Sequence, residues 1–355
     1  MIQRSAAGRL RDLLGWYPVV AISGPRQSGK TTLARATLPD KPYVTLEDPD
    51  ARAFATEDPR GFLDQYPDGA VLDEVQRTPD LASWLQSRVD SDPRTGRFVL
   101  TGSQQFGLFD RISQSLAGRV GFLHLLPFSR SELAASQPNI RLEEALWKGG
   151  YPPIHDRDVP PHIWYSDYLA TYIEREVRQL VNVRDLAQFH RFVLLCAGRT
   201  AQLLNLSSLA ADCGITHNTA AAWMSVLEAS YLVVRVQPFR ENFGKRLVKA
   251  PKLYFLDAGL AAWLSGVRDP EQLVNGPMRG PIFETFVGSE FIKHKRNYLG
   301  EEEHAFWRDS AGHEVDILVE RADRRVLVEV KSGRTIASDW SLGITKLRKI
   351  MGELS

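Results

Sequence analysis

The segment Val19–Leu33 constrains the fold more than any other part of the sequence, and it reads VVAISGPRQSGKTTL. Residues 24–31 match the phosphate-binding pattern G-x-x-x-x-G-K-[ST] at every fixed position. An apolar run precedes the pattern and helical spacing follows it, so a glycine turn that matches by accident is the less favoured interpretation. Such a loop joins a buried strand to a helix, which predicts an α/β domain built on a parallel sheet.

Each residue type in this loop has a physical reason. Gly24 and Gly29 allow the backbone to curl so that successive N–H groups point at a phosphate, and the following helix N-terminus favours an anion. Lys30 would reach the β- and γ-phosphates, and the Thr31 hydroxyl would ligate Mg²⁺. The sequence therefore predicts a site for ATP and Mg²⁺ that is formed by Gly24, Pro25, Arg26, Gln27, Ser28, Gly29, Lys30, Thr31 and Thr32.

Composition sets the broad class of the chain. Its 355 residues are 43% hydrophobic and 25% charged, values that suit two or three globular domains. The net charge of +1 neither favours nor excludes nucleic acid as a partner. Cys196 and Cys213 are too few for a disulfide framework, and no apolar run reaches the ~20 residues of a membrane span. We therefore expect a cytoplasmic protein without a leader sequence or membrane contact.

Apolar runs alternate with helical patterns between residue 16 and about residue 126. Strands are predicted at Val19–Ser23, Tyr43–Leu46, Ala70–Leu72 and Arg97–Leu100. This alternation predicts a parallel sheet with right-handed crossovers, in which polar residues at the carboxyl ends of the strands meet at the nucleotide. We assign residues 1–135 to this P-loop ATPase domain.

Two acidic residues, Asp73 and Glu74, end the third predicted strand and have the form of a Walker B sequence. Asp73 would support Mg²⁺ beside Thr31, and Glu74 would polarise the attacking water. Ser103, or its neighbour Gln104, follows the next strand and would sense the γ-phosphate. The alternative for Ser103 is a polar strand end that only bonds its own loop.

A further cation is expected near the γ-phosphate, because phosphoryl transfer concentrates negative charge there. Arg119, in the sequence Leu-Ala-Gly-Arg, is the candidate for this catalytic role, with Arg111 and Arg26 as rivals. Arg119 would act within its own chain or from a neighbouring subunit of a homo-oligomer. The alternative for each arginine is a solvated surface side chain.

Residues 136–275 are predicted to form a second, largely helical domain. Within it, Leu206–Phe239 has the order of a winged helix-turn-helix, with Gly214 at the turn. The expected recognition helix, Thr216–Trp223, lacks Arg and Lys, which argues against tight sequence-specific DNA binding. A basic stretch follows, with Arg235, Arg240, Lys245, Arg246, Lys249 and Lys252, and we interpret it as a wing face or a surface that meets an acidic partner.

Several segments together resemble a known family. GPRQSGKTT, VLDEVQR, LTGS, SLAGRV, GGYP, the segment around KRLVKAPKLYFLDAGL, and EVDILVE…EVK occur in this order in a large group of prokaryotic AAA-type ATPases whose C-terminal domain has unknown function. The resemblance covers nearly the whole chain. It implies an ATPase core, a winged-helix middle and a small α/β end that is similar to the restriction-endonuclease-like, or PD-(D/E)xK, fold.

The segment 276–355 is predicted to form that third domain, with a helix at Ile282–His294 and three strands after it. Glu314 and Asp316 share one face of a strand, as do Glu329 and Lys331. By resemblance to nuclease-like sites, Asp316 and Glu329 would hold Mg²⁺ or Mn²⁺, Lys331 would activate water, and Glu284 would be an additional helical acid. The alternative is an exposed hairpin with cross-strand ion pairs.

These features support three hypotheses of function. The first is a Mg²⁺-dependent ATPase coupled to a nuclease-like domain that acts on DNA. The second is a regulatory or scaffolding ATPase whose last domain binds a partner without cutting it. The third, a sequence-specific DNA-binding regulator, is disfavoured by the arginine-poor recognition helix.

Overall fold

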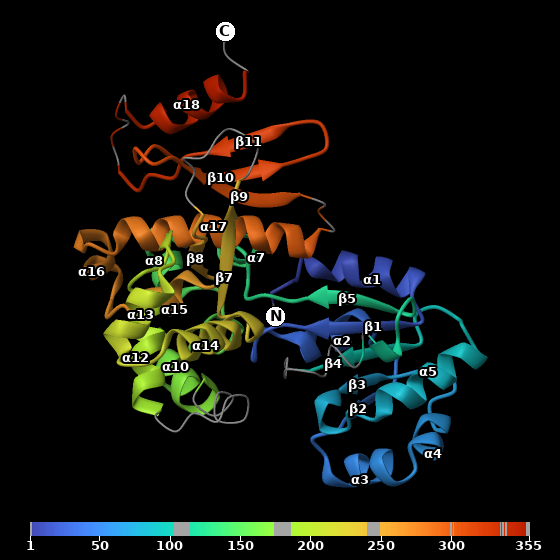
Figure 1. Cartoon of the computed structure of the whole chain (residues 1–355). Coiled ribbons are helices and arrows are strands. Elements are labelled where there is room, and N and C mark those ends of the chain that lie inside the picture. The colour runs from blue at the N-terminus through green and yellow to red at the C-terminus, as the bar shows by residue number, and fades with distance from the viewer. Residues whose placement is uncertain are drawn as a thin grey trace. The chain divides into compact units, whose positions relative to one another are not determined.

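The computed structural model describes residues 2–102, 112, 114–173, 186–239, 249–298, 300, 302–333, 335, 337 and 339–352. The chain divides into two compact units, shown in Figure 1. Unit 1 contains Met1–Phe128 with the short segments Ala229–Tyr231 and Arg296–Leu299, and unit 2 contains the rest. No helix among the described residues is long and apolar enough to cross a membrane.

Unit 1 is built on a five-stranded sheet in the order β2-β3-β4-β1-β5, and all its strands run parallel (Figure 1). This confirms the parallel sheet that the sequence predicts. The described elements of the unit are α1 (Ala6–Trp16), β1 (Val19–Ser23), α2 (Lys30–Thr37), β2 (Tyr43–Thr45), α3 (Pro49–Glu57), α4 (Pro59–Asp64), β3 (Val71–Asp73), η1 (Val75–Arg77), α5 (Leu81–Ser91), β4 (Phe98–Thr101) and β5 (Val120–His124).

Helices cover both faces of this sheet, so β1 is buried at every position. Val20 and Ile22 pack on the side of α1 and α2, whereas Val19 and Ala21 pack on the side of α3, α4 and α5. A continuous apolar strand, rather than an alternating one, is the pattern expected of a parallel sheet with two covered faces. The position of the phosphate loop follows from this core, because the loop leaves the buried end of β1 at Ser23.

Unit 2 contains a second sheet in the order β11-β10-β9-β7-β8-β6. Within it β7 and β9 pair in parallel, and the other neighbouring strands pair antiparallel. The three strands β6, β7 and β8 come from the predicted middle domain, and the other three come from the predicted last domain. The strands are β6 (Gln202–Leu203), β7 (Val233–Pro238), β8 (Lys252–Phe255), β9 (Glu303–Arg308), β10 (Glu314–Glu320) and β11 (Arg325–Val328).

The second and third predicted domains therefore share one sheet and one compact unit. The predicted boundary between these two domains, at residues 275 and 276, remains a prediction. The described helices of unit 2 are α7 (Arg130–Ser136), α8 (Leu142–Lys148), α9 (Pro152–Asp156), α10 (Pro161–Tyr168), η2 (Leu169–Ile173), α12 (Leu186–Ala197), α13 (Leu206–Cys213), α14 (His217–Ala229), α15 (Ala258–Leu264), α16 (Pro270–Asn275), α17 (Arg279–Asn297) and α18 (Leu342–Ile350).

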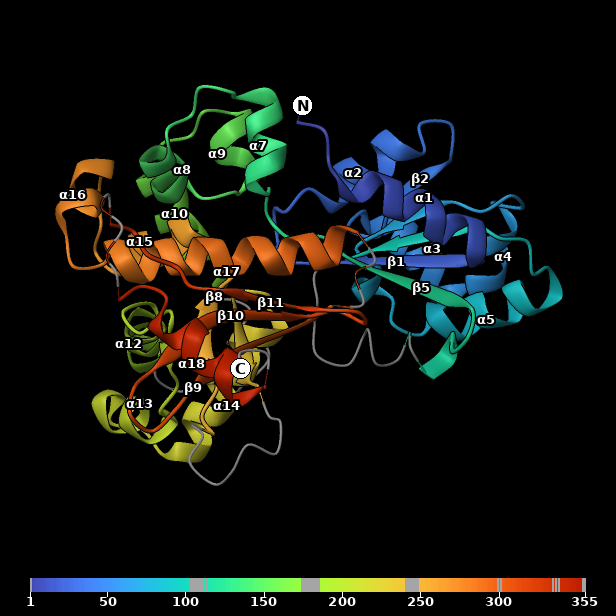
Figure 2. The same ribbon diagram turned by 90° about the horizontal axis from the view of Figure 1, so that it is seen from above.

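A β-bulge in β10 determines which side chains face each covering helix. The pairing of β10 with β9 shifts register between Val315 and Leu318. Val315 and Leu318 consequently pack together with Leu347 of α18, whereas Ile317 and Val319 pack with residues of α17. In Figure 2 the long helix α17 runs alongside β8, β10 and β11.

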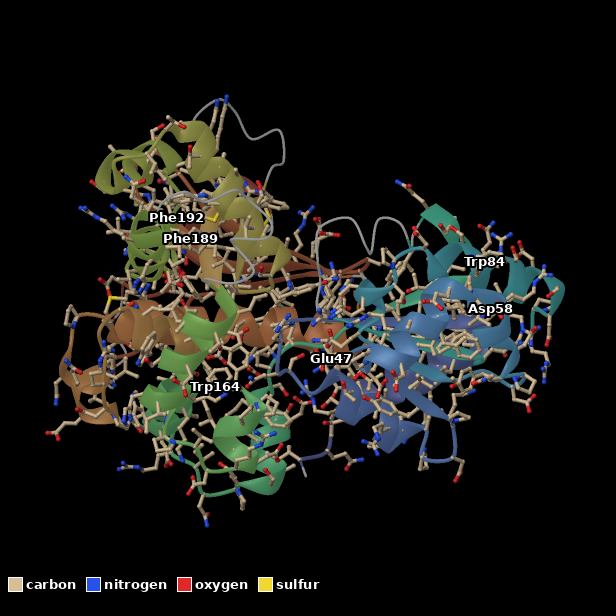
Figure 3. All side chains as sticks on the ribbon, turned by 90° about the horizontal axis from the view of Figure 1, so that it is seen from below. Glu47, Asp58, Trp84, Trp164, Phe189 and Phe192 are labelled. Carbon is tan, nitrogen blue, oxygen red and sulfur yellow. The ribbon has the colours of Figure 1, made fainter. Side chains whose placement is uncertain are left out.

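Aromatic side chains fill the helical core of unit 2. Phe189 and Phe192 lie on α12, are fully buried, and meet the Trp223 ring edge to face with centroids 5.2 and 5.5 Å away. Trp164 on α10 stacks on Tyr168 at 4.7 Å. Figure 3 labels Phe189, Phe192 and Trp164 among the side chains of this unit. These contacts add orientation-dependent attraction to the burial of large apolar surfaces.

A buried carboxylate explains why the Gly-Gly-Tyr-Pro segment has its sequence. Asp257 caps α15 by accepting a hydrogen bond from the N–H of Leu260 at 2.8 Å. It also accepts from the N–H of Gly150 at 2.7 Å and from the hydroxyl of Tyr165 at 2.8 Å. A Cβ on Gly149, which has φ +65°, would lie 2.2 Å from Asp257 Oδ1. The glycine pair therefore lets the loop approach the carboxylate closely.

We predict that Asp257→Ala destabilises unit 2 by about 3 kcal/mol, because three buried donors lose their acceptor. Asp269, an exposed N-cap of α16 that accepts from the N–H of Gln272, is the matched control. Asp269→Ala should cost only about 1 kcal/mol. Chemical denaturation of the intact chain, followed by tryptophan fluorescence, measures both. Equal losses of stability for the two variants would contradict this account.

Candidate functional site

The phosphate loop connects the end of β1 to the start of α2, as predicted. Gly24 has φ +146°, and a Cβ at this position would lie 2.1 Å from the carbonyl oxygen of Leu125. Gly29, which immediately precedes α2, has φ +90°. A side chain at either position would be unfavourable, because both residues have a positive φ and a Cβ on Gly24 would also clash with Leu125. In the loop between them, Pro25 and Ser28 are buried, Arg26 is half-buried and Gln27 is exposed.

The ammonium group of Lys30 is held inside this loop. Its Nζ donates to the carbonyl oxygens of Gly24 at 3.0 Å and Pro25 at 2.8 Å, and the residue is buried. A buried cation that is surrounded by loop carbonyls is a strong attraction for a phosphate. Thr32 is exposed on α2, and the roles proposed for it and for Arg26 and Gln27 remain predictions.

Asp73 is the centre of the polar network beside the loop. The Thr31 hydroxyl donates to its two carboxylate oxygens at 3.0 and 3.1 Å, and the Tyr43 hydroxyl donates to Oδ2 at 2.7 Å. Thr101 at the end of β4 donates to Oδ1. The structure therefore brings the end of β3 together with α2, β2 and β4. Burial and the bond to Asp73 raise the pKa of Tyr43 to about 12, which keeps this hydroxyl a donor.

Glu74 follows Asp73 in a left-handed backbone conformation, with φ +56°. A non-glycine residue in this region carries a conformational cost, and such residues are frequent at functional sites. Gln76 donates a hydrogen bond to Oε2 of Glu74. Burial raises the pKa of Glu74, and the charge of Lys30 partly opposes this rise. A carboxylate with a raised pKa is a better proton acceptor than an ordinary glutamate.

Arg4, which lies near the N-terminus, stabilises the backbone of the phosphate loop. The guanidinium of Arg4 donates to the carbonyl oxygens of Ser28 at 2.8 Å and Leu126 at 2.6 Å. It also lies 4.7 Å from the ring centroid of Phe128. Arg4 therefore fixes the backbone of the phosphate loop against the segment that follows β5.

Arg119 is not placed to reach the nucleotide of its own chain. Val19 pairs with Val120 in the parallel β1–β5 register, so Arg119 lies beside the start of β1, whereas the phosphate loop follows the end of β1. The Arg119 guanidinium pairs with Asp90 at 3.0 Å instead. This corrects the expectation of a role within the chain, and a role from a neighbouring subunit remains a prediction. Ser103, Gln104 and Arg111 lie outside the described residues.

The second predicted constellation is a cluster of carboxylates in unit 2, and a lysine lies at its centre. Lys252 Nζ lies 2.8 Å from Oε1 of Glu284 and 3.1 Å from Oδ1 of Asp316, and it also forms an ion pair with Glu314. The side chain of Lys252 is only 2% exposed. Its burial alone would lower its pKa, but the three carboxylates raise the pKa above the ordinary value. Lys252 is therefore a buried cation.

Glu329 and Lys331 pair with each other beside this cluster. They lie just after the end of β11, so the predicted strand ends earlier than expected, at Val328. Lys331 donates to Oε1 of Glu329, and its Nζ lies 4.0 Å from Oδ2 of Asp316. Burial raises the pKa of Glu329. Lys331 also lines a cavity of about 270 Å³ together with Arg279, Phe283, Leu142, Leu146 and Leu273.

Divalent-metal binding by Glu284, Asp316 and Glu329 does not fit this geometry. Among the described parts of the chain, no group of three or more His, Cys, Asp or Glu side chains is placed to hold a metal ion. The physical reason is local: an ammonium group already lies among the oxygens of Glu284 and Asp316, and Glu329 faces Lys331. The expected metal site is corrected accordingly to a buried ion-pair cluster.

The structure also changes the interpretation of the basic stretch. Arg235 pairs with Glu228, with Nε 2.8 Å from Oε1, and Lys252 points into the buried carboxylate cluster. The sequence predicts that Lys252 belongs to a cationic surface. The structure corrects this prediction, because Lys252 is buried. Arg240, Lys245 and Arg246 lie outside the described residues.

Comparison with known proteins identifies the family. The uncharacterized proteins Rv2008c of Mycobacterium tuberculosis and Mb2031c of Mycobacterium bovis are each 32% identical to the chain over 339 residues, which cover 94% of this chain and 74% of each relative. A family model described as an AAA domain matches residues 17–134. The chain is an AAA-type P-loop ATPase of the family that contains these mycobacterial proteins.

Two further family models match the remainder of this AAA-type ATPase. Both are described as domains of unknown function, DUF8612 at residues 139–271 and DUF4143 at residues 279–355. Among solved structures, the Walker-type ATPase PABY2304 of Pyrococcus abyssi is similar at 15% identity with a TM-score of 0.49, over 74% of this chain and 96% of that chain. RuvB of Thermotoga maritima is similar at 20% identity with a TM-score of 0.31, over 65% of this chain and 88% of that chain.

No sequence pattern indicates that Tyr43, Thr101 or Arg4 of this ATPase belongs to the nucleotide site. Tyr43 and Thr101 each belong to a short strand that the sequence indicates, but their approach to Asp73 depends on the order of strands in the sheet. Arg4 precedes the first helix and belongs to no recognisable pattern. Lys252 was assigned to the basic stretch because its neighbours in sequence are basic.

We predict that Thr101→Val weakens the binding of Mg²⁺ beside the phosphate loop, because the Asp73 carboxylate loses a donor that orients it. The half-saturating Mg²⁺ concentration for ATP hydrolysis should rise by about ten-fold, as expected for loss of one hydrogen bond to a charged group. Thr101→Ser keeps the hydroxyl and is the matched control. Identical Mg²⁺ titrations of the valine and serine variants would show that Thr101 does not position Asp73.

Proposed function

We propose that the chain is a Mg²⁺-dependent ATPase that works as a molecular switch. The observation that carries this proposal is the direct contact of the Thr31 hydroxyl with the Asp73 carboxylate, beside the buried ammonium of Lys30. A hydroxyl and a carboxylate at this distance form the protein's share of a Mg²⁺ site, since Mg²⁺ in such enzymes takes its other ligands from water and the nucleotide phosphates.

Different residues of unit 1 have different roles in ATP hydrolysis. Lys30 exchanges the carbonyls of Gly24 and Pro25 for phosphate oxygens when ATP binds. Thr31 and Asp73 would hold Mg²⁺, which neutralises the charge that develops on the phosphates. Glu74 accepts a proton from the attacking water, and its raised pKa suits this role.

We predict that Glu74→Gln lowers kcat for ATP hydrolysis by about 100-fold or more, because the amide cannot accept a proton. ATP binding should be retained, since Lys30 and Thr31 remain. Glu57→Gln, an exposed glutamate at the end of α3, is the control and should hydrolyse ATP at the unsubstituted rate. Steady-state hydrolysis and fluorescent-nucleotide binding measure the two effects, and a Glu74→Gln enzyme of normal rate would refute the assignment.

The same residue predicts a pH dependence. Glu74 works as a carboxylate, and burial raises its pKa, so protonation removes activity at a pH above the ordinary glutamate range. The hydrolysis rate should therefore fall on acidification through that raised pKa. The residual activity of Glu74→Gln should lack this acidic limb, whereas Glu57→Gln should keep it.

For the remainder of the chain, we propose that ATP turnover regulates the binding of a partner rather than strand cleavage. The carboxylates of unit 2 that were predicted to hold a metal, Glu284, Asp316 and Glu329, are paired with the chain's own Lys252 and Lys331. The cavity beside Lys331 offers a partially apolar place for a ligand group, with Arg279 at its wall. A scaffold or regulatory ATPase uses the last domain in this way.

The second candidate is a nuclease, and one observation favours it. Lys331, Glu329 and Asp316 lie close together, with 4.0 Å between Lys331 Nζ and Asp316 Oδ2, in the order that the restriction-endonuclease-like fold uses. Under our proposal, the purified chain with Mg²⁺ or Mn²⁺ should leave linear, supercoiled and single-stranded DNA intact. Cleavage that Lys331→Ala abolishes, in the presence of unaltered ATPase activity, would establish the nuclease and overturn the scaffold role.

DNA remains a candidate partner. We propose that α13, α14, β7 and β8 form a winged helix, because two helices joined by a turn at Gly214 precede an antiparallel strand pair. The N-terminal part of α14 carries no Arg or Lys, which favours weak or sequence-independent contact. Cys196 and Cys213 are buried free thiols, which supports a reducing, cytoplasmic compartment.

A further inference from the structure

The carboxylate cluster of unit 2 is assembled from distant parts of the sequence. Lys252 begins β8, Glu284 lies on α17, and Glu314 and Asp316 lie on β10. All four belong to the same compact unit. The Lys252 side chain is 2% exposed and that of Asp316 is 6% exposed, so the centre of the cluster is removed from water. Three carboxylates in such a place require a compensating cation.

The Lys252 ammonium supplies a cation that contacts all three carboxylates. An ammonium group has three N–H donors and no acceptor. Lys252 donates to the carboxylates of Glu284 and Asp316 and forms an ion pair with that of Glu314. Its Nζ also lies 5.6 Å from the ring centroid of Phe306 on β9, which contributes a cation–π attraction.

A second layer of bonds fixes the carboxylates around the ammonium. Tyr254 donates its hydroxyl to Oε1 of Glu284 at 2.7 Å, and the N–H of Val330 donates to Oδ2 of Asp316 at 2.8 Å. Arg308 donates to Oε2 of Glu314 at 3.1 Å. Such outer partners resemble those that orient the ligands of a metal ion. Here they orient oxygens toward a lysine.

We propose that the Lys252 ammonium is the built-in cation of this site, in place of the divalent metal that the sequence predicts, and that its removal converts the cluster into a divalent-cation site. A metal ion and the ammonium cannot share these oxygens, because Mg²⁺ binds carboxylate oxygens at about 2.1 Å and would lie beside a positive charge in a dry environment. The proposal concerns unit 2 alone and does not depend on ATP hydrolysis by unit 1.

The test titrates Mn²⁺ into the full-length, nucleotide-free chain. All variants carry Asp73→Asn, which silences the metal site of unit 1, and electron paramagnetic resonance counts bound Mn²⁺. With Lys252 present, the addition of Asp316→Asn should not change the number of bound ions, since none is bound at the cluster. Loss of a bound Mn²⁺ on Asp316→Asn would overturn the proposal directly, whether or not any Lys252 variant folds.

The gain of a site is the stronger result. Lys252→Met should bind one further Mn²⁺ per chain, and its thermal unfolding temperature should rise when Mn²⁺ is added. Asp316→Asn in the Lys252→Met chain should abolish both effects. Circular dichroism monitors folding, and a Lys252→Met chain that folds only with Mn²⁺ supports the proposal equally. A Lys252→Met chain that folds and binds no additional Mn²⁺ would refute it, and if the variant never folds the Asp316→Asn comparison decides.

Discussion

The Asp73 carboxylate is the interaction on which the nucleotide site depends. It accepts hydrogen bonds from Thr31, Tyr43 and Thr101, which come from α2, β2 and β4. These elements can meet at Asp73 only because the sheet order places β3 between β2 and β4. The same carboxylate therefore links three elements at the carboxyl end of the sheet, beside the phosphate loop. A polar network in a buried site is stable only when each member has a partner, so the geometry of the catalytic edge is strongly determined.

The electrostatic constraint in unit 2 is different, because charged side chains are buried inside its folded core. Asp257 satisfies its charge with neutral donors from a loop, a helix N-terminus and a tyrosine. In the cluster around Lys252, the negative carboxylates are compensated by the positive ammonium group. Removing one partner from a buried ion pair commonly costs about 3–5 kcal/mol, because the remaining charge is left without compensation. Both centres thus hold segments together that are far apart in sequence, and neither needs exposure to solvent to do so.

Local sequence patterns predicted much of unit 1. The phosphate loop, four strands and the Asp73–Glu74 pair follow from apolar runs and from residues with few alternative uses. The sequence did not predict the strand β5, because its residues Val-Gly-Phe-Leu-His form a short run that is not uniformly apolar. The partners of Asp73 could not be predicted from spacing, since they depend on which strands are neighbours. Arg119 illustrates the same limit: its position follows from the register of β5 against β1 and not from its own neighbourhood.

In unit 2 two residues of the second constellation, Glu284 and Asp316, contact the same ammonium group, that of Lys252, which the sequence pattern did not indicate. Glu284 and Asp316 do lie together, whereas the pattern that contains Lys252 indicates an exposed basic stretch. Charge pairing across a sheet is invisible to a linear pattern when the partner is more than thirty residues away. The family motif around Lys252, KAPKLYFLDAGL, nevertheless contains both buried centres, because it carries Lys252 and Asp257.

The parallel pairing of β7 with β9 has a consequence for how the protein is made. During synthesis β7 leaves the ribosome well before the strand that completes its hydrogen bonds, since Gln237 and Pro238 pair with Ala305 and Phe306. Until then one edge of β7 is an unpaired template for other chains. In the nucleotide-binding sheet β1 also depends on later segments, since Val19 pairs with Phe98 of β4 and with Val120 of β5. Both sheets therefore contain a strand that is made well before its partners, and the interval before those partners emerge is when this protein is most exposed to misassembly.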